Sequence, residues 1–251
     1  MGLAFVNPGI PTQISFFRRH PAALLLAVQV LGLIMLPALH DVFASRIALA
    51  VFSVISMLVA VLVVIRSQAV SALAILLGVL ALATTLASLF PPYRFLLAYG
   101  MVFEGLLYLY TAGVLVYYML SDHHVTLDEM FAAGATFTLL GWAFTYAYIA
   151  LQHFDPQAFT GLRDPGTPRT WIELAFLSFT NLSATGIGDV LPISPYARLL
   201  AIFEQIFGVG YLGVIVSRFL SLTMHGIASD AHAHGSKSQD ASTNSPPEQH
   251  L

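Results

Sequence analysis

Two glycines and a carboxylate interrupt an apolar stretch in the last third of the chain, FLSFTNLSATGIGDVLPISPYARLL, residues 176–200. Gly186 and Gly188 flank Ile187, and Asp189 follows them directly. Glycine adopts backbone angles that a residue with a Cβ resists, so glycines at alternate positions allow successive carbonyl oxygens to turn toward one axis. The chemistry that this spacing offers is therefore that of main-chain oxygen atoms, with one side-chain carboxylate beside them.

The composition places this stretch in an integral membrane protein. The chain has 251 residues, of which 57% are hydrophobic and 9% are charged, and its mean hydropathy is +0.80. That is too little polar surface to cover a water-soluble globule. Because the chain has no cysteine, it has no disulfide framework and no thiolate metal site. A net charge of -3 with ten dispersed Lys and Arg residues gives no reason to expect a nucleic-acid partner.

Six segments are apolar and long enough to cross a bilayer, whose roughly 30 Å core needs about 20 helical residues. They cover residues 21–39, 44–65, 69–89, 95–120, 130–151 and 198–222. The first segment follows Arg18 and Arg19 but exceeds the about 7–15 apolar residues of a signal peptide, so we interpret it as a retained span. Thr126 and Glu129 have the spacing of a capping box at the start of the fifth segment.

The segment between the fifth and sixth spans is neither a plain loop nor a span. Residues 152–170 are rich in Pro, Gly and charge, which predicts an exposed loop. Thr170 and Glu173 then have the spacing of a second capping box. The helix that they open, residues 171–183, would be about 20 Å long, which is too short to span the membrane.

The glycines lie between this short helix and the last span, which Ser194 and Pro195 open as N-cap and first helical residue. Irregular backbone at membrane depth is tolerated only where protein buries it or where it lines a water-filled path. The pattern is therefore a span, a re-entrant half-helix, an irregular glycine segment and another span.

Residues 170–222 resemble the pore region of potassium channels, in which a short pore helix, a T-V-G-Y-G-D filter and an inner helix follow one another. The two glycines and the aspartate match the family pattern, and the flanking sequence is similar to that of bacterial six-span members. The resemblance extends back to about residue 125, whereas the first four spans agree only in number and hydrophobicity. The six filter positions here, which Ser183 precedes, are Ala184, Thr185, Gly186, Ile187, Gly188 and Asp189.

The resemblance implies an all-α membrane protein with six transmembrane helices and a re-entrant pore helix and selectivity filter between the fifth and sixth. Four chains would surround one axis, and rings of their backbone carbonyls would replace the water of a dehydrated potassium ion. No cofactor or metal other than this permeant cation is implied. The pore helix would point its negative C-terminal end toward the cavity below the filter, which favours cations there.

The resemblance also assigns roles to single residues. Ala184, Thr185, Gly186 and Ile187 would supply the carbonyl rings, and Gly188 would close the outer end of the filter. The residues that would support the filter are Phe176, Thr180, Ser183 and Asp189. Gly208 lies where the family has a glycine that lets the inner helix bend, and Gly210 follows it, although close helix packing explains small residues there equally well.

Several filter positions depart from the family pattern. Ala184 replaces a threonine whose hydroxyl completes the innermost ion site, and Thr185 stands where an apolar residue is usual. Ile187 replaces a tyrosine that braces the filter. Phe176 occupies the position of a tryptophan that can donate to the filter aspartate, so Asp189 needs another partner or water.

Charged residues elsewhere leave alternatives open. Glu104 lies well inside the fourth span, where a carboxylate has either a gating or proton-sensing role or a tyrosine partner such as Tyr99 or Tyr108. Glu204, on the last span, is expected to face the pore helix and pack there. The fourth span has only Arg94, at its edge, which argues against gating by voltage through that helix.

Four parts of the chain follow from this reading. Residues 1–20 are a cytoplasmic N-terminus, 21–120 a four-helix transmembrane domain without voltage-sensor arginines, 121–222 the pore domain, and 223–251 a disordered cytoplasmic tail poor in large apolar side chains. The Lys and Arg residues divide evenly between the two sides, so orientation rests on the resemblance, which puts both termini in the cytoplasm. The location would be a bacterial inner membrane.

The function expected is passive, potassium-selective conduction by a homotetramer in the lipid bilayer, with no enzymatic step and no identified regulatory partner. A weakly selective cation channel is the alternative, because three filter positions depart from the pattern. A secondary transporter also places broken helices at the middle of the membrane. Transporters of that kind usually contain internal repeats, and residues 1–125 contain no second interrupted segment.

Overall fold

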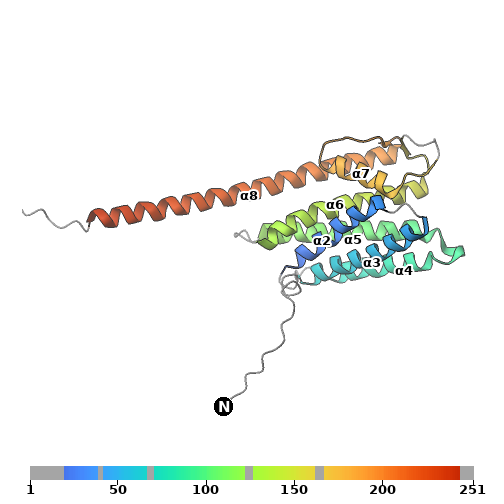
Figure 1. The fold of residues 1–251 in the computed structure, drawn as a ribbon, viewed down its shortest axis with the longest axis horizontal. Helices are drawn as coiled ribbons and strands as arrows, with labels where there is room; N and C mark the ends of the chain where they lie inside the picture. The colour runs from blue at the N-terminus through green and yellow to red at the C-terminus, as the bar shows by residue number, and fades with distance from the viewer. Residues whose placement is uncertain (1–19, 39–41, 67–70, 122–126, 162–166, 244–251) are drawn as a thin grey trace, which may run out of the picture.

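A computed structural model describes residues 20–38, 42–66, 71–121, 127–161 and 167–243 of the chain. This part is almost entirely helical, as expected. Its α-helices are α2 (Pro21–Met35), α3 (Val42–Arg66), α4 (Ser71–Ala87), α5 (Leu96–Ser121), α6 (Leu127–Phe154), α7 (Trp171–Leu182) and α8 (Pro195–Thr243), with 3-10 turns at Leu36–Ala38 and Pro91–Tyr93. In Figure 1, α2 to α6 form a bundle, and α7 lies beside the first part of α8 at one end of it.

Length and composition allow three of these helices to cross a membrane. They are α5, α6 and the Pro195–Arg218 part of α8. The described apolar segments Pro21–Met35, Ala50–Arg66 and Ser71–Ala87 are shorter than the about 20 residues that a span needs. The structure therefore bears out an all-helical membrane protein, while spans by the first three helices stay a prediction.

Helix α6 is the centre of the bundle. In its most apolar window 78% of the residues are buried, against 22% for α8. Trp142 and Tyr148 are fully buried, and the Trp142 ring lies 4.9 Å from the ring of Phe52 in α3. Small residues let neighbours approach: a Cβ on Gly141 would lie 2.5 Å from the Phe179 ring of α7. Helix α6 thus connects the first helices to the region of the glycines.

The connection between α6 and α7 is more ordered than the predicted exposed loop. Strand β1 (Phe159–Thr160) pairs antiparallel with strand β2 (Leu191–Pro192), which follows the glycine segment. Ala158 and Phe159 are buried, and the Phe159 ring meets Tyr148 edge to face at 5.4 Å. Composition alone failed here because pairing with residues 31 and 33 positions away in the sequence covers this part of the loop.

Helix α8 begins where the sequence predicts it. The Ser194 hydroxyl accepts a hydrogen bond from the Ala197 amide at 3.3 Å, and Pro195 is the first helical residue. The helix then continues to Thr243 and extends far beyond the bundle (Figure 1). The prediction of a disordered tail from residue 223 is therefore wrong for residues 223–243. A helix that has already formed extends without a new nucleation cost, even where few apolar residues remain to pack.

Candidate filter and pore helix

A complete capping box sets the start of α7. The Thr170 amide donates to Glu173 Oε2 at 2.6 Å, and the Glu173 amide donates to Thr170 Oγ1 at 3.4 Å. This confirms the predicted box. The box at Thr126 and Glu129 lies outside the described residues, since Thr126 is not among them. The helix has 12 residues, about 18 Å at 1.5 Å per residue, and Ser183 is its C-cap residue.

The glycine segment is attached to the C-terminal end of α7 through one carbonyl group. Thr180 O accepts hydrogen bonds from the Thr185 amide at 3.0 Å and from the Gly186 amide at 3.1 Å. The Thr185 hydroxyl donates to the same oxygen at 3.1 Å, and the Ser183 hydroxyl does so at 3.2 Å. The structure thus places Thr180, Ser183 and Thr185 together, and the main chain of Thr180 makes these contacts.

The backbone alternates in handedness at the start of this segment. Ala184 has a φ of +58° and Gly186 a φ of +61°, whereas Thr185 and Ile187 have no positive φ. Positive φ angles were expected at the two glycines, Gly186 and Gly188. They occur instead at Ala184 and Gly186. An L-residue held at positive φ costs roughly 1–2 kcal/mol. Strained backbone conformations of this kind are concentrated at binding sites and other functional sites. The strain at Ala184 is therefore consistent with a binding site in this segment.

Residues 184–189 are exposed on the single chain. The Ile187 side chain is 67% exposed, and within the described part of the chain the Asp189 carboxylate has no hydrogen-bond partner. The Phe176 ring lies beside Gly188, 3.8 Å from where a Cβ would stand. These residues are therefore available to groups outside the chain.

Sequence reasoning missed a buried polar cluster behind α7. Glu204 of α8 is fully buried, and its two carboxylate oxygens accept hydrogen bonds from Ser178 Oγ and Tyr148 Oη, both at 2.5 Å. Asn181 Nδ2 donates to Tyr148 Oη at 3.4 Å, and Ser178 Oγ is also 2.7 Å from Gly141 O. Glu204 does face α7, the predicted pore helix, but it makes hydrogen bonds there and does not merely pack.

Where burial is described, the buried residues of α8 form one narrow line. They are Ala197, Ala201, Glu204, Gly208 and Tyr211, spaced by four and three residues in turn. This is the spacing of a single helix–helix contact line. The sequence signal that could have indicated a buried Glu204 is its position one helical turn before Gly208, among residues spaced by three and four.

Glu104 has one of the partners that were considered for it. Ser53 Oγ lies 2.9 and 2.7 Å from its two oxygens, and Tyr108 donates to Oε1 at 2.9 Å. Tyr99 instead packs its ring edge to face on Phe154 at 5.6 Å. Glu104 is thus held between α3, α5 and α6, since Tyr146 of α6 is a further hydrogen-bond partner.

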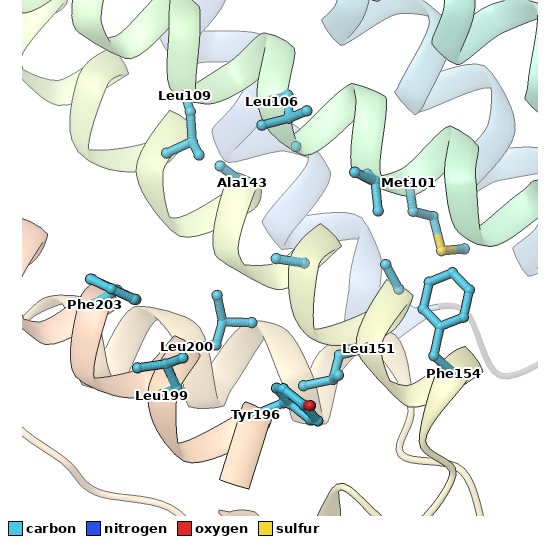
Figure 2. Close-up of a pocket in the computed structure, with 14 residues that line it drawn as sticks. Met101, Leu106, Leu109, Ala143, Leu151, Phe154, Tyr196, Leu199, Leu200 and Phe203 are labelled. Carbon is cyan, nitrogen blue, oxygen red and sulfur yellow. The ribbon is translucent and has the colours of Figure 1, made fainter. Parts of the chain in front are cut away.

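The described residues also line an open apolar pocket of about 440 Å³ between α5, α6 and the start of α8 (Figure 2). Leu106 of α5 and Leu199 and Phe203 of α8 face into it. No charged side chain lines it, so it offers nothing that could coordinate an ion.

A model of one protein family, described as ion channel, matches residues 105–225. Residues 105–225 of the chain belong to the potassium channel superfamily. No curated protein and no solved structure matches it. The matched part of this channel begins inside α5 and contains α6, α7, the glycine segment and the described contact line of α8. Helices α2 to α4 lie outside it.

Proposed function

We propose that four copies of this channel protein form a potassium-selective pore, with residues 184–188 as the selectivity filter. The observation that carries the proposal is the alternating backbone of Ala184 and Gly186, attached to the end of a capped half-helix. Such a backbone can present successive carbonyls to one axis, where four chains replace the hydration shell of a cation. Conduction is passive, and no cofactor other than the permeant ion takes part.

The exposed surface supports assembly into a homotetramer. Besides the filter itself, α8 leaves a large apolar face uncovered in the single chain. It includes Leu199, Ile202, Phe203, Ile206, Phe207 and Val209. Contiguous exposed apolar surface favours burial against another copy or against lipid. In the proposed tetramer, different parts of this exposed surface of α8 would contact the neighbouring copies, the conduction path and the bilayer.

The proposed topology has six spans, with α2, α3 and α4 as the first three. Both termini lie in the cytoplasm, and the membrane is the inner membrane of a bacterium. In this arrangement the half-helix α7 and the filter enter the membrane from the outside and do not cross it. Gly208 and Gly210 are proposed as the place where α8 bends during opening.

The experiment that tests the proposal is recording from the purified protein in planar bilayers with potassium on one side and sodium on the other. We expect unitary currents whose reversal potential follows the potassium gradient. A reversal potential near zero with currents of both ions would favour the weakly selective cation channel, which Ile187 and the unpartnered Asp189 carboxylate support among the described contacts. Uphill flux without unitary currents would favour a transporter.

A further inference from the structure

We propose that Glu204 is a positioning residue for ion selectivity, because it fixes the pore helix from behind and thereby the backbone of the filter. The inference rests on the proposed channel function and adds a determinant that lies outside the filter. Glu204 is fully buried on α8 and accepts hydrogen bonds from one residue of the pore helix, Ser178, and one of α6, Tyr148. A single carboxylate thus connects the three helices of the pore domain.

Helices α7 and α8 contact each other at two points that are about one helical turn apart on both helices. Ser178 meets Glu204, and four residues later on both helices Leu182 meets Gly208. At the second position a Cβ on Gly208 would come within 2.0 Å of the Leu182 carbonyl oxygen. The two helices cannot slide past each other without breaking the first contact or creating a clash at the second.

The same part of the pore helix organises the filter. Thr180, between Ser178 and Leu182, supplies the carbonyl that binds the amides of Thr185 and Gly186. A displacement of this end of α7 therefore moves the attachment point of the filter directly. Ion selectivity depends on where the carbonyl oxygens lie and how freely they move, so we infer that it depends on Glu204.

The chemistry of the cluster separates positioning from simple space filling. A glutamine at position 204 keeps a side-chain oxygen and adds two donors, so it can bond both Ser178 and Tyr148. A leucine has similar bulk but leaves the buried Tyr148 hydroxyl without this acceptor, which is costly in a dry environment. Selectivity should accordingly survive Glu204→Gln and fail in Glu204→Leu.

The test is the potassium-over-sodium permeability ratio, measured from reversal potentials of single channels of the full-length protein. We expect Glu204→Gln to stay close to wild type. Glu204→Leu removes the hydrogen bonds from both Ser178 and Tyr148, and its permeability ratio should fall by about tenfold or more. Ser178→Ala should shift the ratio in the same direction. Adding Ser178→Ala to Glu204→Leu should then change little, because both act through one contact.

Glu104→Leu is the matched control. It removes a buried carboxylate with the same kinds of partner, a serine and tyrosines, but these partners lie in α3, α5 and α6 and not in α7 or α8. It should reduce the amount or heat stability of the channel and leave its reversal potential unchanged. A general loss of stability would affect both glutamate variants alike, so an equal change of selectivity in both would overturn the inference.

Two further outcomes are decisive. If Glu204→Leu does not assemble, Tyr148→Phe serves as the milder variant, because it removes only one hydroxyl. Its permeability ratio should fall several-fold. An unchanged ratio in both Tyr148→Phe and Ser178→Ala would overturn the inference. If wild-type channels are potassium-selective and the variants have the same permeability ratio, this inference is overturned and the proposed function stands. Wild-type protein without selective current would overturn the proposed function, and the inference with it.

Discussion

The backbone of Leu182 occupies the space that a side chain at Gly208 would need. A Cβ on Gly208 would lie 2.0 Å from the Leu182 carbonyl oxygen and 2.8 Å from its carbonyl carbon. Such distances do not occur between unbonded atoms, so the last turn of α7 and helix α8 touch backbone to backbone. This contact requires glycine whether or not α8 also bends there.

Replacing Gly208 with alanine should therefore separate α7 from α8. We expect a loss of roughly 1–3 kcal/mol of stability per chain from the overpacked contact, together with a loss of current. Thermal unfolding of the detergent-solubilised protein and bilayer recording measure the two effects. Gly213→Ala is the control, since a Cβ there meets no described atom within 4 Å. Normal stability with an altered open probability in Gly208→Ala would instead favour a hinge without a packing role.

The two filter glycines should differ in their tolerance of alanine. Gly186 has a φ of +61°, where an L-residue costs roughly 1–2 kcal/mol, and four such residues would surround the axis. Gly188 has no positive φ, and a Cβ there would meet Phe176 at an ordinary 3.8 Å. We expect Gly186→Ala to abolish current and Gly188→Ala to leave a measurable one in bilayer recordings. The reverse order would show that the conducting filter has another backbone.

Substitutions at Ala184 should separate the effect of an added hydroxyl on barium block from the effect of backbone strain on stability. A serine there adds a hydroxyl ring at the innermost ion site, and block by cytoplasmic barium should become tighter. Threonine adds the same hydroxyl but is β-branched, which is unfavourable at a φ of +58°. Glycine relieves the strain without adding oxygen, so Ala184→Gly should be more heat-stable and block like wild type. Equal barium block in all three variants would mean that residue 184 does not line the path.

Opening should depend little on voltage. Helix α5 contains no Lys or Arg, and its one carboxylate, Glu104, is held by Ser53 and Tyr108. Moving one charge across the membrane contributes only about 2.3 kcal/mol per 100 mV, so steep gating needs several mobile charges. A conductance–voltage relation of purified channels measures this. A steep curve equivalent to several gating charges per channel would contradict the prediction, whereas weak rectification would not.

Some features of this protein could be predicted from the sequence because neighbouring residues decide them. The capping box of Thr170 and Glu173, the N-cap at Ser194 and the length of the half-helix between them depend on side chains a few positions apart. Helix length against bilayer thickness and the need to satisfy the backbone in lipid then restrict what such a segment can do. The membrane class and the position of the glycine segment followed from these local rules.

Tertiary structure decided the features that depend on residues far apart in the chain. In the sequence, Glu204 is a single carboxylate in an apolar helix. Only the folded chain places Ser178, 26 residues away, and Tyr148, 56 residues away, within hydrogen-bond distance of it. The pairing of β1 with β2 and the close approach of Gly208 to Leu182 are of the same kind. The positive φ of Ala184 also went against its residue type, because the Thr180 carbonyl binds the amides of the next two residues. Helix packing chooses among many pairings that local propensity leaves equal in energy, and only the packed chain shows which pairing it chose.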